Sequence, residues 1–314
     1  MIFNESSLEL PNPPGSNGSN HLYIGRFAPS PTGPLHFGSL VAALASYLDA
    51  KSKTGTWLIR IEDLDPPRES VGAAEIILEQ LQTLGFVWDG EVLYQSSRLE
   101  AYETSLQQLN AQGLCFCCNC TRPRIQALGT VYDGHCRANK NILERSEQHA
   151  IRIQTANQTI RFGDLIQGKH HQNIELDVGD FVIKRKDNLF AYQLAVVVDD
   201  AFQNVTDVVR GFDLIDSTAR QIYLQQQLFL PTPRYAHFPV ATNTAGEKLS
   251  KQQHASGINV SRSSECLLQA MKFLGLNVDP VLTGEPPKVL MNWAISQWDI
   301  QNVPKLATIS GNWI

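Results

Sequence analysis

Early in the chain, apolar runs and polar loops alternate in a way that predicts a strand, a helix and a second strand. Residues 22–27 and 57–61 are short apolar runs typical of strands. Between them, residues 39–52 repeat apolar side chains at helical spacing, and Gly55 follows the expected end of this helix. This order predicts a βαβ unit, in which two parallel strands are joined by a right-handed connection.

Two further helices are predicted where apolar side chains share a helical face and a glycine ends the pattern. The first lies within residues 72–85 and the second within residues 98–113. Residues 114–186 are cysteine-rich and then alternate in short segments, which predicts an inserted β-containing module. Beyond it, the pattern predicts a buried strand at 194–198, a helix at 217–229, and two or three short helices near the C-terminus.

The segment RFAPSPTGPLHFGSL, residues 26–40, predicts a shaped loop that leads into the first helix. Its three prolines remove backbone donors and fix φ, so the segment cannot form a central strand or the inside of a helix. A glycine-bearing loop at a helix start directs N–H groups at a ligand, and phosphate is the natural one. The pattern is neither G-x-G-x-x-G nor G-x-x-x-x-G-K-[ST], so it indicates neither a dinucleotide-binding enzyme nor a P-loop NTPase.

A histidine in this loop adds a candidate for phosphate chemistry. The imidazole of His36 can donate to a phosphoryl oxygen, while Gly38 leaves room for an adenosine. A histidine that only hydrogen-bonds within a tight turn fits the spacing equally well. The sequence around His36 alone therefore leaves both interpretations open.

A second basic element lies far downstream, in TNTAGEKLSKQQHASG, residues 242–257. Lys248 and Lys251 flank Leu249 and Ser250 in a loop without apolar periodicity. Lysine is a compact, movable cation that can follow charge developing on a phosphate. Taken alone, an ordinary exposed loop is the simpler interpretation, and only the pairing with the His36 loop favours phosphate chemistry.

The cysteines are concentrated in one segment, which predicts a metal site. Five of the six cysteines fall within residues 115–136, and the N-terminus lacks the features of a secretory signal, so metal binding is expected rather than disulfides. Cys-x-Cys followed sixteen residues later by another cysteine suits a closed tetrahedral zinc site. The spacing leaves open which four residues bind the metal, because six compete: Cys115, Cys117, Cys118, Cys120, His135 and Cys136.

Composition narrows the picture only slightly. The 314 residues are 43% apolar and 18% charged, as in a globular protein, and no apolar run is long enough to suggest a membrane span. The net charge of −5 gives no general basic field for nucleic acid. A local basic face remains possible, and its dense candidates are Arg122, Arg124, Lys184, Arg185 and Lys186.

Two of these motifs together resemble the class I aminoacyl-tRNA synthetases. PLHFGS resembles their HIGH signature and EKLSK their KMSKS signature, while RFAPSPTGPLHFGSL followed by LIRIEDLDPPR is similar to the glutamyl and glutaminyl branch. The resemblance covers residues 24 to about 255. Ser39 stands where the second histidine of HIGH is expected, and Gln252 where the last serine of KMSKS is. The HIGH-like residues are Pro29, Leu35, His36, Phe37, Gly38 and Ser39, and the KMSKS-like residues are Lys248, Leu249, Ser250, Lys251 and Gln252.

This resemblance implies an α/β fold with a Rossmann-like parallel sheet and ATP-dependent activation of glutamate, with Mg²⁺ accompanying the ATP. His36 and Lys251 are the catalytic candidates, because an α-phosphate with developing charge needs donors and cations. The implied ATP-binding residues are His36, Gly38, Ser39, Lys248 and Lys251. The implied L-glutamate-binding residues are Arg26, Phe27, Ala28, Pro29, Ser30, Glu62, Tyr192 and Arg210, which include the arginines and the carboxylate that an amino dicarboxylate requires.

The resemblance also favours one ligand set for the metal and one division of the chain. It implies a single structural Zn²⁺ bound by Cys118, Cys120, Tyr132 and Cys136, with His135 or Cys117 as the alternatives to Tyr132. The expected parts are a flexible tail (1–20), a catalytic domain in two halves (21–113 and 191–240), an inserted zinc-binding module of acceptor type (114–190), and the lysine loop with a small C-terminal helical region (241–314).

Length points to the short glutamyl-queuosine branch, because about sixty residues after Lys251 leave no room for a helical anticodon-binding domain. That branch implies activation of glutamate without tRNA and transfer to the queuosine base of tRNA(Asp), by a cytoplasmic monomer that is not bound to a membrane. The alternatives are a truncated or discriminating glutamyl-tRNA synthetase that charges a tRNA 3′ end, and a non-catalytic zinc-bearing RNA-binding paralogue. A nucleotidyltransferase that shares only the histidine loop is less consistent with Glu62, Tyr192 and Arg210.

Overall fold

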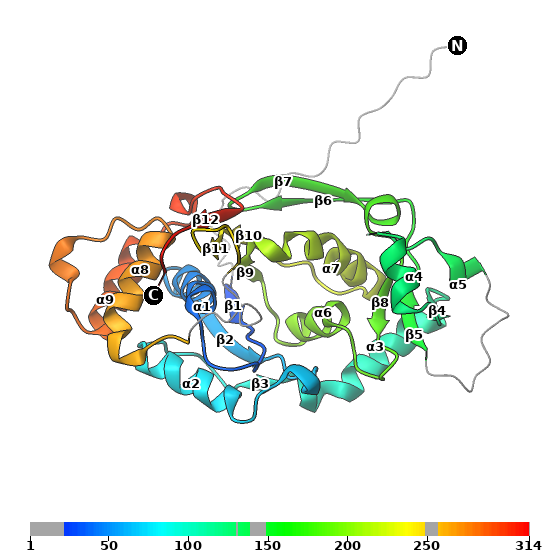
Figure 1. Ribbon diagram of the computed structural model, residues 1–314, viewed down its shortest axis with the longest axis horizontal. Coiled ribbons are helices and arrows are strands. Elements are labelled where there is room, and N and C mark those ends of the chain that lie inside the picture. Colours follow the sequence, from blue (N-terminus) through cyan, green and yellow to red (C-terminus); the bar gives the residue numbers. More distant parts are fainter. Residues whose placement is uncertain (1–21, 130, 139–148, 249–256, 314) are drawn as a thin grey trace, which may run out of the picture.

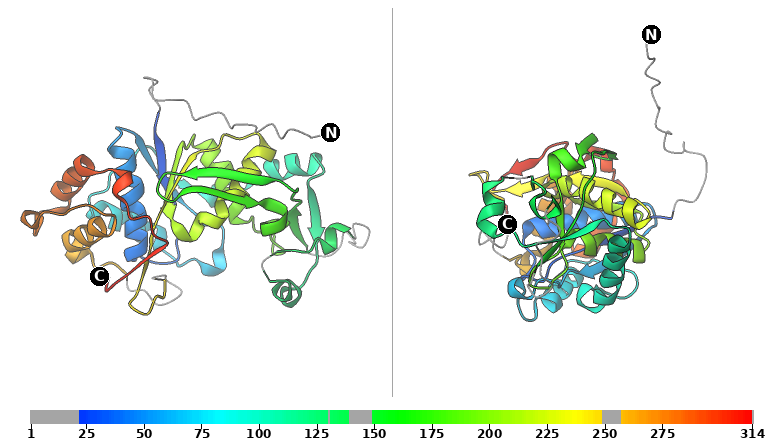
Figure 2. Two further views of the ribbon diagram at one scale, coloured as in Figure 1. Left: turned by 90° about the horizontal axis from the view of Figure 1, so that it is seen from above. Right: turned by 90° about the vertical axis from the view of Figure 1, so that its right-hand side faces the viewer.

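The computed structural model describes residues 22–129, 131–138, 149–248 and 257–313. The molecule is elongated, with α8 and α9 at one end of its long axis and the β4–β5–β8 sheet at the other (Figure 1). Seen along that axis it is compact (Figure 2). The expected tail and residues 249–252 of the KMSKS-like motif lie outside the described residues.

The first strands and helices confirm the predicted βαβ unit. β1 and β2 pair in parallel, with Ile24 opposite Thr56 and Phe27 opposite Ile59. α1 lies between them in the sequence and begins two residues earlier than its apolar pattern indicated, because His36 and Ser39 cap its first turn. The elements of this half are β1 (Ile24–Phe27), α1 (Phe37–Lys51), β2 (Thr56–Ile61), α2 (Ala73–Thr83), β3 (Leu93–Tyr94) and α3 (Leu99–Ala111).

In the second half of the core, one predicted element is wrong. Residues 194–198 belong to a helix and not to a buried strand. A row of β-branched residues here is buried on a helix, so tertiary packing overrides the strand propensity of valine. The helix predicted at 217–229 is confirmed. The elements are α6 (Tyr192–Phe202), β9 (Asp207–Gly211), α7 (Ile215–Leu228), β10 (Arg234–Phe238) and β11 (Val240–Thr242).

Two sheets meet at β1 and β9 to form the central layer. β1, β2 and β3 form one sheet, and β9, β10, β6 and β7 form the other. The N–H of Thr206 donates to the carbonyl of Ile24 at 2.9 Å, which places β9 beside β1. The order across the layer is therefore β3-β2-β1-β9-β10-β6-β7. The strands β1, β2 and β3 are parallel to one another, and so are β9, β10 and β6. The Rossmann-like parallel sheet that the resemblance implies is thus present.

The segment between the two halves contributes to two different sheets. β4, β5 and β8 form a small antiparallel sheet, while the hairpin of β6 and β7 joins β10 of the central layer. The predicted domain boundaries at 114 and 190 stay a prediction. The elements are β4 (Cys115–Cys118), α4 (Arg122–Ala127), α5 (His135–Ala138), β5 (Ala150–Ile153), β6 (Thr159–Asp164), β7 (Gly168–Asn173) and β8 (Phe181–Lys184).

The C-terminal residues form the predicted short helices and pack against α1. α8 (Ser263–Phe273) and α9 (Pro287–Gln297) share one hydrophobic core with α1, β1 and β2. β12 (Thr308–Ser310) pairs with β11 and completes this end. A second core joins α3, α6 and α7 to the inserted segment. Among the described residues, no helix combines the length and the apolar character needed to cross a bilayer.

Candidate active site

A cavity of about 1110 Å³ opens where β1, β2 and β9 end beside the start of α1. It brings together residues predicted from distant parts of the chain. Every predicted site residue of the catalytic core that the structure describes lines it, except Phe37: Arg26, Phe27, Ala28, Pro29, Ser30, Leu35, His36, Gly38, Ser39, Glu62, Tyr192, Arg210 and Lys248. Phe37 instead lies in the hydrophobic core, where its ring packs against Phe273 and Trp313.

The proline loop is fixed to the core through its carbonyl groups. The carbonyl of Pro29 accepts from the N–H of Glu62 at 2.9 Å, and the carbonyl of Pro31 accepts from the N–H of Ser70 at 3.0 Å. The side-chain amide of Gln80 accepts from the N–H of Leu35 at 2.7 Å. Prolines have no N–H to satisfy, so these few bonds hold a loop whose φ angles are already restricted. The cavity wall is therefore a rigid segment.

His36 and Ser39 form a reciprocal cap at the start of α1. Nδ1 of His36 accepts from the N–H of Ser39 at 3.3 Å, and Oγ of Ser39 accepts from the N–H of His36 at 2.8 Å. Since Nδ1 is an acceptor, the neutral imidazole carries its proton on Nε2. Ser39, which departs from the HIGH signature, is thus the residue that completes a capping box. The α1 terminus and an imidazole donor lie together at the cavity.

Asp200 holds two buried arginines beside the cavity. Its Oδ1 accepts from Nε of Arg26 at 3.1 Å and from Nη1 of Arg60 at 2.7 Å. Burial opposes ionisation of Asp200, but the two guanidinium groups outweigh it and hold the pKa of the carboxyl below its usual range. Burial raises the pKa of Glu62, against the charges of Arg60 and Arg26. Positive guanidinium groups and negative carboxylates therefore lie next to one another at this side of the cavity.

Arg210 is held by a second buried chain of hydrogen bonds. Its Nε donates to Nε2 of His237 at 2.9 Å, and Nδ1 of His237 lies 2.6 Å from Oδ2 of Asp164. Nη1 and Nη2 of Arg210 donate to Gln221 and Thr218 at 2.7 and 2.8 Å. Burial lowers the pKa of His237 to about 4, so the ring is neutral at pH 7 and donates from Nδ1 to the carboxylate of Asp164. These bonds fix the orientation of the guanidinium.

Two further predicted residues reach the cavity from other elements. Tyr192 is the first residue of α6 and not the end of a strand, and burial raises the pKa of its hydroxyl. Lys248 pairs with Asp213 through Nζ and Oδ2, at 2.7 Å. On the other side of residues 249–256, the N–H of Ile258 donates to the carbonyl of Leu35 at 2.7 Å. Both described ends of the lysine loop therefore lie beside the proline loop or the cavity.

The cysteine segment gathers three thiols. Cys118, Cys120 and Cys136 have sulfur atoms within 4.8 Å of one another, and among the described residues this group includes neither Cys117 nor His135. The hydroxyl oxygen of Tyr132 lies 3.6 Å from Sγ of Cys118 and 3.5 Å from Sγ of Cys120. Zn–S bonds of about 2.3 Å in a tetrahedron require edges of about 3.7 Å. The three thiols and the phenol oxygen fit a tetrahedral zinc ion.

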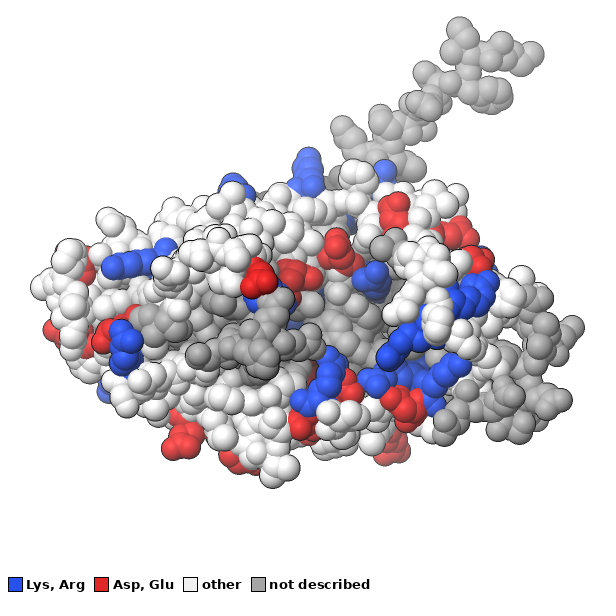
Figure 3. Space-filling view, in the orientation of Figure 1, with Lys and Arg blue, Asp and Glu red and all other residues white. Residues whose placement is uncertain are grey.

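The basic residues singled out from the sequence are mostly paired. Arg124 pairs with Asp133, Arg185 with Asp65 and Asp187, and Lys184 with Glu103. In the right-hand half of Figure 3, Lys and Arg side chains gather around a hollow, and Asp and Glu side chains lie among them. The face is mixed in charge, and of the basic residues singled out from the sequence, Arg185 lines the large cavity.

Sequence reasoning missed the residues that support the site. Asp200, His237 and Gln221 fix the two arginines, yet none belongs to a short motif. The one available signal was the pair of acids that ends the run LAVVVDDA, since adjacent carboxylates after a buried segment need cationic partners. The partners of Asp200 lie on β1 and β2. Those of Asp199 are Gln95, Arg98 and Tyr102, and local sequence reveals neither set.

Comparison with known proteins now identifies the family. Residues 24–273 match the family described as tRNA synthetases class I (E and Q), catalytic domain. The chain belongs to the class I tRNA synthetases of the E and Q type. It is a ligase-type enzyme that uses ATP and Mg²⁺, with glutamate and tRNA as the substrates that this family implies.

Several similar curated proteins carry the same name. A glutamyl-Q tRNA(Asp) synthetase of Serratia proteamaculans is 49% identical over 92% of this chain and 94% of its own length. One of Thiobacillus denitrificans is 51% identical over 90% of this chain and 95% of its own length. Among solved structures, a glutamate-tRNA synthetase of Elizabethkingia anophelis superposes with a TM-score of 0.77 at 25% identity, over 93% of this chain and 68% of that one. The class I synthetase fold inferred from sequence is confirmed.

Proposed function

We propose that the enzyme activates L-glutamate with ATP in the absence of RNA, and then transfers glutamate to the queuosine base at the wobble position of tRNA(Asp). One observation carries the proposal: a single cavity is lined by Arg26, Glu62 and Arg210 as well as by His36 and Lys248. The names of the relatives support the acceptor. Charging of a tRNA 3′ end is the competing reaction.

The charges of the cavity suit glutamate. This amino acid has two carboxylates and one ammonium group, so its site needs guanidinium donors and one protein carboxylate. Arg26 and Arg210 supply the donors, and Glu62 supplies the carboxylate. Both arginines are anchored by buried bonds to Asp200 and His237, which reduces the cost of ordering them on binding. Tyr192 and Ser30 complete the proposed glutamate site.

Activation is a displacement at the α-phosphate of ATP. A carboxylate oxygen of glutamate forms a bond to the α-phosphorus, the bond to the bridging oxygen breaks, and pyrophosphate leaves with Mg²⁺. Catalysis then requires positioning and charge neutralisation at a five-coordinate phosphorus. Nε2–H of His36 and the N-terminus of α1 are the proposed donors to the α-phosphate, and Lys251 is the proposed cation that neutralises its charge. Lys248 and Ile258, which flank it, support this role, because they lie at the cavity and against Leu35.

Transfer reuses the same adenylate. A hydroxyl of the cyclopentene-diol of queuosine attacks the acyl carbon and an ester bond forms. AMP leaves with the electron pair of the broken anhydride bond, and the hydroxyl proton passes to the departing phosphate or to solvent. This hydroxyl is chemically similar to a ribose hydroxyl, so no further catalytic group is needed. RNA docking alone has to differ from that of an enzyme that charges a 3′ end.

We place the enzyme in the cytoplasm as a monomer.

Zinc has a structural role in this proposal. Cys118, Cys120, Cys136 and Tyr132 would complete a closed site without an open position, which is typical of structural zinc. When bound, the ion supplies four coordinate bonds and no reacting group. It would fasten β4 to the segment at Tyr132 and to α5, next to the rest of the small sheet.

Exchange of label between pyrophosphate and ATP tests the activation step. We expect glutamate-dependent exchange with no RNA present, and exchange only after tRNA is added would contradict the proposal. His36→Asn separates chemistry from capping, because asparagine is a good N-cap but has no imidazole. This variant should unfold like the wild type and lose about 100-fold or more in exchange rate, which is the cost of losing one transition-state donor.

A further inference from the structure

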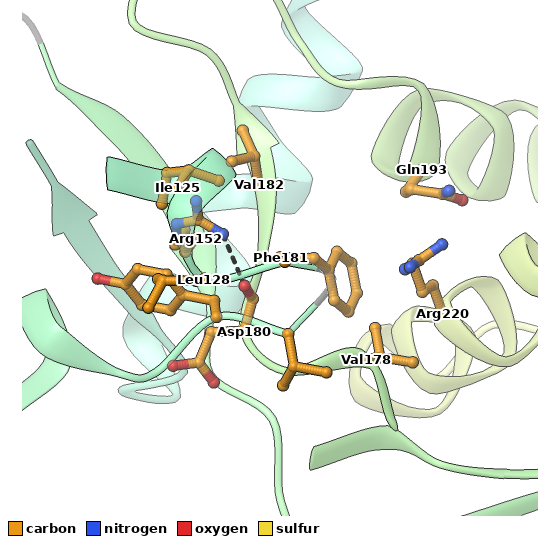
Figure 4. Close-up of a pocket in the computed structure, with 12 residues that line it drawn as sticks. Ile125, Leu128, Arg152, Val178, Asp180, Phe181, Val182, Gln193 and Arg220 are labelled. Atoms are coloured by element: carbon orange, nitrogen blue, oxygen red, sulfur yellow. Dashed lines mark hydrogen bonds between the residues drawn. The ribbon is translucent and has the colours of Figure 1, made fainter. Parts of the chain in front are cut away.

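A second cavity, of about 210 Å³, lies between α4, β8 and the starts of α6 and α7. Most of its wall is apolar, from Ile125, Leu128, Val178, Phe181 and Val182. Figure 4 shows Gln193 and Arg220 on one side of it, Arg152 on the other, and the Phe181 ring between them in this view. An apolar pocket with a few convergent polar groups is the usual form of a small-ligand site.

Arg220 is the charged group of this pocket with the weakest hydrogen bonding to the protein. Its Nη1 donates only a long bond, 3.4 Å, to the carbonyl of Asp216. In the part of the chain that the structure describes, no carboxylate oxygen lies within 4.0 Å of its guanidinium nitrogens. Burial lowers the pKa of this guanidinium, with Asp216 opposing. Arg152 differs, since its Nη1 donates to the carbonyl of Asp180 at 2.7 Å and its guanidinium lies over the Tyr132 ring.

Neighbouring residues of α6 line this pocket and the larger cavity. Tyr192 lines the larger cavity and Gln193, the next residue, lines the smaller one. Oε1 of Gln193 accepts from Nε2 of Gln221 at 3.0 Å, and Oε1 of Gln221 accepts from Arg210 at 2.7 Å. A group bound in the pocket therefore lies next to the residues that hold the proposed glutamate site.

We propose that this pocket binds one unstacked nucleobase of the RNA substrate, adjacent to the nucleotide that receives glutamate; the inference rests on the proposed function. Proteins read single-stranded RNA by stacking splayed bases on aromatic rings or guanidinium planes and bonding to their edges. Phe181 and Arg220 offer such faces, and Gln193 offers an amide. A phosphate would not gain from the apolar walls of Ile125 and Val182, so a base is the favoured occupant.

The test uses wild type and Arg220→Ala with a queuosine-containing anticodon stem-loop, intact or with one abasic nucleotide beside queuosine. Loss of a stacked base costs about 1–3 kcal/mol, which is about fivefold to 150-fold in affinity. We expect an abasic position to raise the wild-type RNA KM about tenfold. Arg220→Ala should raise the KM for intact RNA by a similar factor and show no further rise with the abasic RNA. Arg220→Lys should behave like Arg220→Ala, because lysine lacks the planar fork.

Two controls separate this inference from the proposed function. Exchange without RNA should stay within twofold of wild type in both Arg220 variants, which also shows that they fold. Arg262→Ala, which removes a surface arginine beside α8, should leave RNA transfer unchanged. An unchanged RNA KM in Arg220→Ala would overturn the inference. An equal abasic penalty in wild type and variant would overturn it as well, because it would indicate a phosphate contact. Loss of wild-type exchange would instead contradict the proposed function.

Discussion

The Nε–H of Arg210 donates to Nε2 of His237 across 2.9 Å, in a fully buried position between β9 and β10. His237 in turn hydrogen-bonds Asp164, at the end of β6. A neutral imidazole thus connects a carboxylate of the inserted segment to a guanidinium at the cavity. The direction in which Arg210 presents its charge depends on two residues, His237 and Asp164, that do not line the cavity.

Removal of the imidazole should weaken glutamate binding selectively. A hydrogen bond to a charged group contributes about 1.5–3 kcal/mol, so His237→Ala should raise the glutamate KM by about tenfold or more. The ATP KM should change less than twofold in the same exchange assay. His171→Ala, an exposed histidine on β7, is the matched control. Equal increases in the KM values of glutamate and ATP would show that His237 acts through general stability alone.

The same histidine should make stability depend on pH. Burial lowers the pKa of His237 from 6.5, the ordinary value expected in the unfolded chain, to about 4 in the folded protein, so the unfolded chain binds the extra proton between these values. The stabilisation is complete above pH 6.5 and is lost as pH falls toward 4. Between pH 7.5 and 5 the loss is about 2 kcal/mol in the free energy of unfolding. Urea titrations should show a flatter pH dependence for His237→Gln, and identical slopes would refute this assignment.

Asp200 should be one of the most sensitive buried positions. Asp200→Asn leaves Arg26 and Arg60 without their shared carboxylate, and breaking a buried ion pair costs about 3–5 kcal/mol. Chemical denaturation should show a loss of this size. Asp187→Asn removes the exposed partner of Arg185 and should change stability by less than about 1 kcal/mol. Similar values for the two variants would mean that Asp200 is not essential to the core.

Metal analysis should separate the proposed ligands from the neighbouring cysteines. Cys118→Ser should lose most of the bound zinc, while Cys115→Ser, which is outside the group of three thiols, should keep it. Tyr132→Phe tests the fourth ligand, because it preserves the ring packing against Phe116 but removes the oxygen. Its zinc affinity should fall, while that of His135→Ala and Cys117→Ser should not. Loss of zinc in His135→Ala with full retention in Tyr132→Phe would reverse the assignment.

Much of the framework was predictable because its signals are local. The βαβ unit, α2, α3 and α7 follow from apolar periodicity with glycine or proline punctuation. α6 was not predictable in this way. Its valines favour a strand, but Asp199 has to receive bonds from Gln95 and Tyr102 at 2.9 and 2.5 Å, and those partners lie about one hundred residues earlier. Both the packing of these valines in the core and the bonds of Asp199 depend on residues distant in the sequence.

In the candidate site, too, some residues are indicated by a local motif, and others are not because their partners are distant in the sequence. His36 and Arg26 lie in one contiguous motif, so the sequence indicates them directly. His237 lies 73 residues from Asp164, and Asp200 lies 174 residues from Arg26, so no spacing rule links them. Resemblance supplies the residues proposed to contact substrates, whereas the residues that hold them in place appear only when the sheet order is known.

The central claim concerns the acceptor, and one measurement tests it directly. Queuosine-containing tRNA(Asp) that lacks its 3′-terminal adenosine keeps the modified base but has lost the ribose on which ordinary charging takes place. With ATP and labelled glutamate, we expect this RNA to be glutamylated at the rate of the intact tRNA, and the same RNA with guanosine in place of queuosine to remain unlabelled. Loss of labelling on removal of the terminal adenosine would contradict the account and indicate ordinary charging of the 3′ end.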